Sequence, residues 1–272
     1  MANYLSPQEI TDYTSEGGVN KVNRSVILVL TMAIMAGVYI ALGGFASSVA
    51  AHDIANKGVA KLVTGAVFPI GLMFVVINGA DLFTGNCLIV ISTLEKKTSW
   101  VGFIKNLVIV LIGNFIGALF IAFLVANSGI LDMSNGGFGA YMMKTAATKV
   151  NLGFTEALCL AILCNIFVCA GIWMIYAAKD IPGKILAGFF SIFAFAISGA
   201  EHIVANMFYV PVALFAKTNE YLELAHVTAD QISWSKFFIN NAIPVVLGNI
   251  IGGLFIGCMY FVIYKKLTKP SK

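Results

Sequence analysis

Two short segments carry residue types that could hold and polarise an anion, and they repeat each other. The first, 79–86, reads Gly-Ala-Asp-Leu-Phe-Thr-Gly-Asn, and the second, 199–206, reads Gly-Ala-Glu-His-Ile-Val-Ala-Asn. His202 is the one histidine within the long apolar runs of the chain. An ionisable group inside such a run is a candidate for function. A neutral imidazole there could donate a hydrogen bond to an acid anion, or gain a proton as the anion arrives.

Other polar residues of the same segments have plainer interpretations beside the functional ones. Thr84 offers a hydroxyl that can serve an anion or water, or that simply caps its loop. Asp81 and Glu201 would repel an anion if they faced it, so we expect them to brace the exposed amides of their own loops. Asparagines recur in the apolar runs, where neutral amides join helices or line a polar path without the cost of a charge. They are Asn78, Asn86, Asn114, Asn165, Asn206 and Asn249.

The sequence favours neither a metal site nor a cofactor. Three of the five cysteines, Cys159, Cys164 and Cys169, recur every five residues, which places successive ones about 140° apart around a helix. They therefore share no face on which to bind a metal. The chain also has no phosphate-binding glycine loop, zinc-protease motif or serine elbow. We expect no metal, no cofactor and no enzymatic activity.

The composition places these segments in a lipid bilayer. Of 272 residues, 59% are hydrophobic and 11% are charged, where a soluble domain has roughly 25% charged residues. These values, with a mean hydropathy of +0.90, exclude a soluble globule, a disordered tail and a nucleic-acid binder. We predict an all-α membrane protein with six spans, at about 25–51, 62–94, 106–131, 150–178, 185–216 and 237–264.

The flanking segments indicate the orientation. Residues 1–24 form an N-terminal segment with a short helix, which begins at Ser6-Pro7-Gln8-Glu9 and is predicted to end at Gly17-Gly18. This helix is either a plain surface helix or a lid. Residues 265–272 form a basic tail. An even number of spans puts both termini on one side, and Lys and Arg are concentrated on that side. We therefore expect cytoplasmic termini in an inner or plasma membrane.

Two of the spans are too long to cross the bilayer as straight helices. Residues 61–93 and 184–216 would each measure roughly 50 Å as a helix, against a hydrocarbon thickness of about 30 Å. We expect spans two and five to break at mid-membrane, beside their glycine and acid. A second repeat, Gly113-Asn-Phe-Ile-Gly117 and Gly248-Asn-Ile-Ile-Gly252, indicates an inverted 3+3 repeat. Half-helix N-termini that point inward favour an anion at the centre.

Four motifs, in order along the chain, resemble the formate/nitrite transporter family. They are 78–85 (NGADLFTG), 161–169 (AILCNIFVC), 198–207 (SGAEHIVANM) and 243–253 (IPVVLGNIIGG). The resemblance covers nearly the whole chain, and the motifs look closest to the formate branch. It implies a homopentamer of six-span protomers, each with its own anion pore, in an aquaporin-like fold.

The resemblance also implies roles for individual residues. His202 would be the central histidine and Thr84 its partner, with Asn165 lining the path and Asn249 adding a polar contact. Lys149 would draw anions into a vestibule, which suits a cation at the outer end of the fourth span, although such a lysine can also simply snorkel to the interface. The apolar constrictions would be formed by Leu72, Leu82, Phe68, Phe83 and Phe195.

These expectations together describe a channel or transporter for small monovalent weak-acid anions, with formate first. Protonation near His202 would let the solute cross the apolar constrictions as a neutral acid, which avoids most of the desolvation cost. Nitrite, hydrosulfide, lactate and acetate remain alternative substrates.

A water or glycerol facilitator should carry Asn-Pro-Ala boxes, and none of the six prolines follows an asparagine. An intramembrane enzyme using His202 and Glu201 would need a metal cluster or a nucleophile. The expected partners are the anion, the bilayer and further copies of the chain, without nucleic acid.

Overall fold

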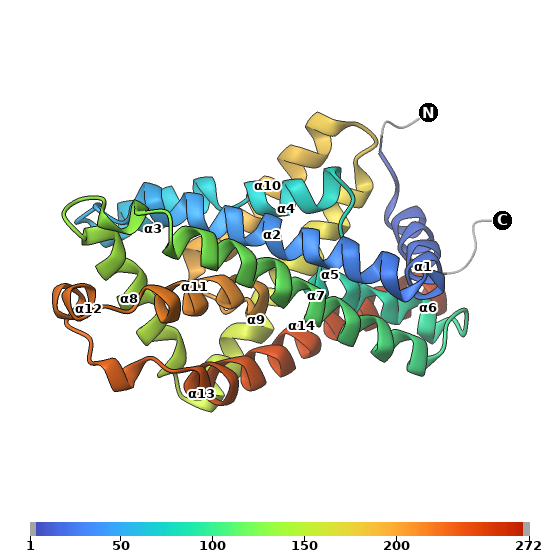
Figure 1. Cartoon of the computed structure of the whole chain (residues 1–272). Coiled ribbons are helices and arrows are strands. Elements are labelled where there is room, and N and C mark those ends of the chain that lie inside the picture. Colours follow the sequence, from blue (N-terminus) through green and yellow to red (C-terminus); the bar gives the residue numbers. More distant parts are fainter. Residues whose placement is uncertain (1–3, 269–272) are drawn as a thin grey trace.

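The computed structural model describes residues 4–268, which are almost wholly helical (Figure 1). The first half contains α1 (Pro7–Asn23), α2 (Val26–Ala51), α3 (Lys57–Val67), α4 (Ile70–Ile77), α5 (Phe83–Asn86), α6 (Val90–Leu94) and α7 (Trp100–Ala126). The second half contains α8 (Gly137–Val150), α9 (Phe154–Ala177), α10 (Ile181–Ser198), α11 (Ile203–Ala216), α12 (Asn219–Ala225), α13 (Trp234–Lys236) and α14 (Ile243–Phe261). Single helical turns join several of these, and π-helical turns flank α14 at 237–242 and 262–267. The predicted all-helical fold is confirmed.

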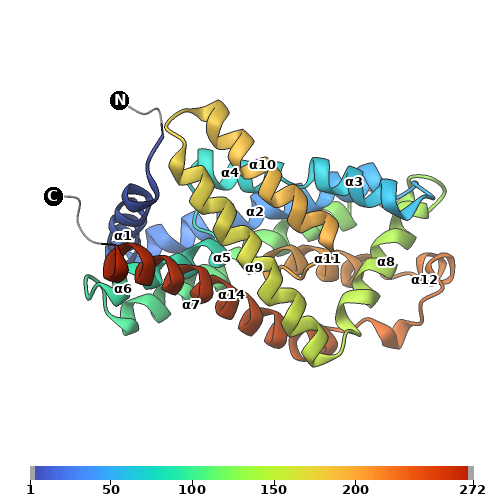
Figure 2. The same ribbon diagram turned by 180° about the vertical axis from the view of Figure 1, so that it is seen from behind.

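Within residues 4–268, six helical segments are long and apolar enough to cross a membrane. They are Val26–Ala51, Lys57–Ile77, Trp100–Ala126, Phe154–Ala177, Ile181–Ser198 and Ala229–Leu267. The helix α1 lies across one end of the bundle beside α6, and α8 and α12 lie at the opposite end (Figures 1 and 2). Residues 269–272 of the basic tail lie outside the described residues, as do residues 1–3 of the N-terminal segment.

Some predicted boundaries differ from the helices. The helix α7 begins at Trp100, six residues before the predicted span, because Ser99 caps it and the charged Lys105 lies on its exposed side. The chain turns at 151–153, between α8 and α9. Lys149 therefore belongs to the last turn of α8, and the prediction that it lies at the end of the fourth span is wrong.

The predicted start of α1 is confirmed, and its predicted end is wrong. Ser6 caps the helix, and Ser6 and Glu9 exchange the two hydrogen bonds of a capping box. The helix then runs through Gly17 and Gly18 to Asn23. A Cβ atom on Gly18 would lie 2.5 Å from Oγ of Ser92, so this glycine permits close packing on the helix beneath instead of ending α1.

Two equivalent helix pairs form the frame of the bundle, α2 against α7 and α9 against α14. Both rely on glycine for close approach of the backbones. A Cβ atom on Gly117 would lie 2.0 Å from the carbonyl oxygen of Ile34, and one on Gly252 would lie 2.3 Å from that of Ile162. Small residues at such contacts let apolar helices meet where no water is expelled to drive association.

The carboxylate of Glu95 is one of the groups that tie α1 to the rest of the protein. It accepts hydrogen bonds from Ser15 of α1, from Lys97 at 2.8 Å and from Lys265 at 2.8 Å. Lys265 also pairs with Asp12 of α1. Burial alone would raise the pKa of Glu95, but the bonds from Lys265, Lys97 and Ser15 outweigh burial and lower the pKa to about 2.

Replacing Glu95 by glutamine should therefore loosen α1. We expect Glu95→Gln to lower the melting temperature of the purified protein at pH 7 by roughly 2–4 °C. Because the folded pKa lies below the ordinary value of 4.5, the difference from the wild type should be complete above pH 4.5 and shrink as the pH falls toward 2. The exposed carboxylate Glu16, also on α1, supplies the control Glu16→Gln. Equal melting temperatures for wild type and Glu95→Gln at pH 7 would contradict this assignment.

Candidate functional site

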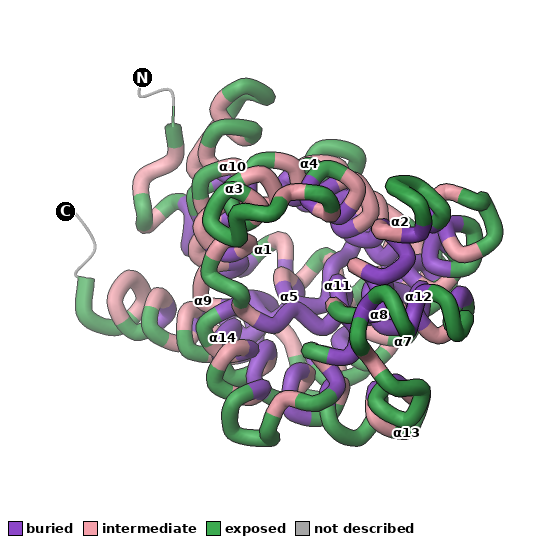
Figure 3. Tube along the Cα trace, turned by 90° about the vertical axis from the view of Figure 1, so that its left-hand side faces the viewer, coloured by how far each residue is buried: buried purple, intermediate pink, exposed green. Residues whose placement is uncertain are grey.

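The two segments singled out by their repeat lie between helices. Residues 78–82 separate α4 from α5, and residues 199–202 separate α10 from α11. Gly79 and Gly199 have φ angles of +77° and +75°, in the left-handed region that favours glycine. The short helices α5 and α11 thus begin inside the protein, among the buried segments at its middle (Figure 3).

Two buried asparagines hold the exposed backbone of these segments. The side chain of Asn114 accepts from the N–H of Phe83 at 2.9 Å and donates to the carbonyl oxygen of Asp81 at 3.0 Å. Asn249 accepts from the N–H of Ile203 at 3.0 Å and donates to the carbonyl oxygen of Glu201 at 2.9 Å. Backbone groups at interrupted helices need such partners because the surroundings are apolar.

The structure brings His202 and Thr84 together. Oγ1 of Thr84 lies 3.1 Å from Nε2 of His202, and both side chains are buried. His202 is also the N-cap residue of α11, and its Nδ1 accepts from the N–H of Ala205 at 3.2 Å. Since Nδ1 is an acceptor, the neutral ring must carry its hydrogen on Nε2. Nε2–H then donates to Thr84, which leaves the threonine hydroxyl hydrogen for another acceptor.

Asn165 and Asn249 use their amides inside the protein. Nδ2 of Asn165 donates to the carbonyl oxygens of Thr84 and Asn249, at 3.2 Å and 2.5 Å. Both asparagines are fully buried. In the structure both amides therefore bond to backbone groups, the plainer of the two roles considered for these asparagines, and their place along an anion path stays a prediction.

A cavity of about 140 Å³ opens at the end of the molecule where α8 lies, and we call it the α8 mouth. Lys149 and His202 line it. Nζ of Lys149 lies 2.8 Å from Oε1 of Glu201, and Oε2 of Glu201 accepts from Asn206 at 2.6 Å. Asn241 donates to the carbonyl oxygen of Lys149 at 2.9 Å.

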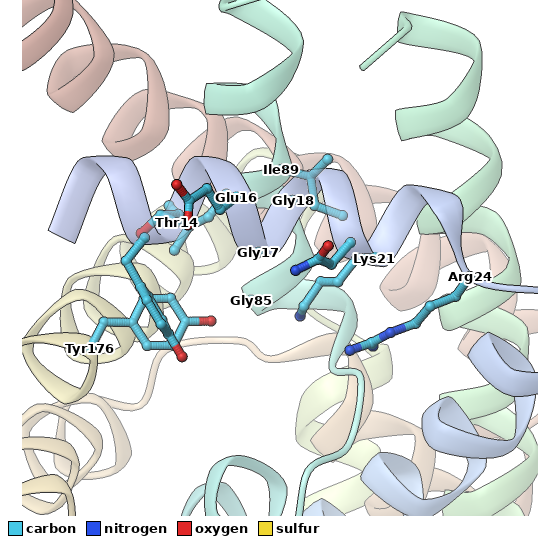
Figure 4. A pocket seen from close by; sticks show the side chains of 12 residues that line it. Thr14, Glu16, Gly17, Gly18, Lys21, Arg24, Gly85, Ile89 and Tyr176 are labelled. Carbon is cyan, nitrogen blue, oxygen red and sulfur yellow. The ribbon is translucent and has the colours of Figure 1, made fainter. Parts of the chain in front are cut away.

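At the opposite end, two adjoining cavities of about 220 and 260 Å³ form the α1 mouth. Lys21, Arg24 and Tyr176 line both cavities, and Figure 4 shows the two cations reaching from α1 toward the side of the pocket where Gly85 lies. Asp81 pairs with Lys21 at 3.0 Å and with Arg24 at 2.8 Å.

These contacts correct the expected role of Asp81 and Glu201. We expected the two carboxylates to brace the amides of their own loops, but Asn114 and Asn249 do so. The carboxylates pair with lysines and an arginine instead, because a buried charge is strongly destabilising unless a counter-charge accompanies it.

The two mouths are built alike, which the sequence prediction missed. Lys21-Val22-Asn23 ends α1, and the same triplet, Lys149-Val150-Asn151, ends α8. Asn106 donates to the carbonyl oxygen of Lys21 at 3.2 Å, as Asn241 does to that of Lys149. The repeated triplet is the sequence signal that could have identified Lys21 and its neighbour Arg24.

Four of the five predicted apolar residues lie beside the mouths. Phe68 and Phe195 line the α8 mouth with ring centroids 5.7 Å apart, and Phe195 also contacts His202. Leu72 and Leu82 line the α1 mouth and are almost fully buried. Phe83 is buried in the core and is not among the residues that line these cavities. Each mouth is thus lined in part by large apolar side chains, close to the hydrogen-bonded pair of His202 and Thr84.

This arrangement suits passage of a small solute. Among residues 4–268, no group of three His, Cys, Asp or Glu side chains could hold a metal ion. The five cysteines are free thiols, of which three are buried.

Comparisons with known proteins agree with this geometry. The sequence profile of the formate/nitrite transporter family matches residues 8–262. A probable formate transporter from Methanothermobacter thermautotrophicus is 42% identical over 88% of this chain and 89% of its own length. The formate channel FocA of Escherichia coli K12 is 35% identical over 96% of this chain and 94% of its own length.

A solved structure is similar over the same extent. The pentameric formate channel with formate bound is 32% identical, covers 89% of this chain and 98% of its own, and superposes with a TM-score of 0.78. Its family comprises channels and transporters, not enzymes. The chain is thus a multi-pass membrane protein that belongs to the formate/nitrite transporter family.

Proposed function

We propose that this protein moves small monovalent weak-acid anions, formate first, across the membrane. The observation that carries the proposal is the His202–Thr84 hydrogen bond, buried where α5 and α11 begin and flanked by apolar side chains on both sides. Helix N-termini carry partial positive charge, which favours an anion over a cation. Formate transport by the relatives supports the choice of substrate.

The proposed architecture is an inverted 3+3 repeat of aquaporin-like form in which spans two and five break at mid-membrane. The matched roles of Asn114 and Asn249, and of Lys21 and Lys149, support this repeat. The pore domain would cover 25–264, between an N-terminal segment at 1–24 and a basic tail at 265–272. Both termini would be cytoplasmic, so the α1 mouth would open to the cytoplasm.

We further propose a homopentamer with one pore in each protomer. The pentameric state of the similar formate channel supports it. The helices α7 and α14 also carry large exposed apolar side chains, which suit contact with lipid or with neighbouring protomers. They include Phe120 and Phe123 on α7, and Leu247, Ile251 and Phe255 on α14.

In the proposed mechanism, the cations of either mouth raise the local anion concentration, and the anion then meets the central pair. The free hydroxyl hydrogen of Thr84 would bind the anion's oxygen. As a neutral acid, the solute would cross both the rings of Phe68 and Phe195 and the side chains of Leu72 and Leu82. A bare charge there would be costly to desolvate.

His202 would act as a neutral donor throughout. A proton added to the ring would go to Nδ1, where it would confront the N–H of Ala205 and remove the cap of α11. This constraint disfavours a stably charged imidazolium. The proton that neutralises the anion would come from water in the mouths, while the neutral His202 and Thr84 keep their own hydrogens and hold the solute by hydrogen bonds until that proton arrives.

The substrate is tested by flux into proteoliposomes. We expect formate flux that increases as the pH falls, and less or no flux of glycerol, with protein-free liposomes as the control. A preference for nitrite or hydrosulfide would support the proposed anion pore and would assign the protein to another branch of its family. Flux of glycerol without formate would overturn the proposal.

The role of His202 is tested by a substitution that preserves the cap. Asparagine can accept from the N–H of Ala205, so His202→Asn should fold while it lacks the imidazole donor. We expect its formate flux to change by less than about twofold between pH 7 and pH 5, while the wild-type flux rises more steeply. The exposed His226 supplies the control His226→Asn. Full pH dependence in His202→Asn would contradict the proton linkage.

The hydroxyl of Thr84 is tested by a pair of variants. Thr84→Val keeps the shape of the side chain and removes the hydroxyl, and we expect formate flux to fall about tenfold, as for the loss of one buried hydrogen bond. Thr84→Ser restores the donor and should retain most of the flux. Equal rates in the valine and serine variants, measured in proteoliposomes, would show that the hydroxyl does not contact the solute.

A further inference from the structure

We propose that Arg24 makes the two mouths unequal and gives the α1 mouth an anion contact that the α8 mouth lacks. Anions would therefore bind more strongly from the side on which α1 lies. The inference rests on the proposed function, since it concerns the same anion path. It assigns to Arg24 the recognition of small monovalent anions such as carboxylates.

The α1 and α8 mouths can be compared position by position, because the residues that line them repeat along the chain. Counting 128 positions from α1 to α8 pairs Tyr13 with Tyr141 and Lys21 with Lys149, and each of these four residues lines its mouth. The same count pairs Arg24 with Leu152. Leu152 lies in the turn after α8 and is not among the residues that line the α8 mouth, so the α8 mouth has no counterpart of Arg24.

The contacts give the two mouths different sets of cations. Asp81 is paired with two cations, since Lys21 lies 3.0 Å from Oδ1 and Arg24 lies 2.8 Å from Oδ2. Glu201 is paired with Lys149 only among the described residues. The cations that line the α1 mouth are Lys21, Arg24 and Lys184, beside the carboxylates Glu16 and Asp81. Lys149 is the one charged side chain among the residues that line the α8 mouth, so that mouth has no second cation beside its ion pair.

Arg24 also retains donors for a ligand. Its contact with Asp81 uses Nη1, and within residues 4–268 neither Nη2 nor Nε has an acceptor. The side chain is 28% exposed and lines both cavities of the α1 mouth, beside Lys21 in Figure 4. A guanidinium held on one side by a carboxylate presents its remaining N–H groups in fixed positions, a geometry that matches a carboxylate oxygen.

The test compares the two faces of the membrane. Formate flux is measured in right-side-out and inside-out vesicles, and the half-saturating formate concentration is determined on each face. A unit charge about 7 Å from the anion in a water-like medium changes binding about threefold. We expect Arg24→Leu to raise the half-saturating concentration about threefold at the face of the α1 mouth and to leave the other face unchanged.

The reciprocal variant transfers the charge. Leu152→Arg should lower the half-saturating concentration at the face of the α8 mouth, which keeps the proposal testable even if Arg24→Leu fails to fold. Arg24→Lys keeps the charge, so we expect it to raise the half-saturating formate concentration by less than Arg24→Leu does. Lys105→Gln is the control, because Lys105 is a nearby exposed cation that lines neither mouth.

The outcomes separate this inference from the proposed function. Absence of anion flux in the wild type would overturn the proposed function itself. Anion flux with unchanged half-saturation in both Arg24→Leu and Leu152→Arg would overturn the inference alone. Equal shifts on both faces in Arg24→Leu would also overturn it, because they would mean a general change of the pore instead of a local anion contact.

Discussion

The structure depends on one constraint, which is that backbone polar groups buried among apolar side chains must find partners within the protein. The chain interrupts two of its helical segments deep inside, at 78–82 and 199–202, and so exposes N–H and C=O groups that no helix satisfies. One asparagine for each interruption, Asn114 or Asn249, binds an N–H and a C=O of the backbone at the point where the next helix begins. Asn165 links the two sites through the carbonyl oxygens of Thr84 and Asn249.

The frame of helices follows from the same constraint. The two asparagines reach the gaps because their helices, α7 and α14, approach α2 and α9 closely, and this approach requires glycine on either side of each asparagine. The sequence Gly-Asn-x-x-Gly therefore places a donor and acceptor between two backbone contacts. Buried carboxylates impose a second demand, which Lys21, Arg24 and Lys149 meet from the ends of α1 and α8. These ion pairs hold α1 against the bundle.

Much of this could be predicted from the sequence, and the failures share a physical cause. The apolar runs identified the helical fold, which depends on local patterns. The repeat and the family resemblance identified the pairing of His202 with Thr84, although these residues lie far apart in the chain. The partners of Asp81 and Glu201, the use of Asn165 and the packing of Gly18 depend on contacts between residues far apart in the chain. A glycine pair ends a helix in one setting and admits a neighbouring helix in another, and only the neighbour distinguishes the two.

The repeat also separates the residues that hold the fold from those suited to function. Positions that agree between the two copies, the glycine, the acid and the asparagine, satisfy backbone and charge in the same manner at both ends. Positions that differ include the two residues of the proposed site, Thr84 and His202. His202 occupies the place of Leu82, so α11 begins at an imidazole and α5 begins at an apolar side chain. In the proposed path the His202–Thr84 pair lies between the leucines and the phenylalanines, and the direction of approach decides which of them the solute crosses first.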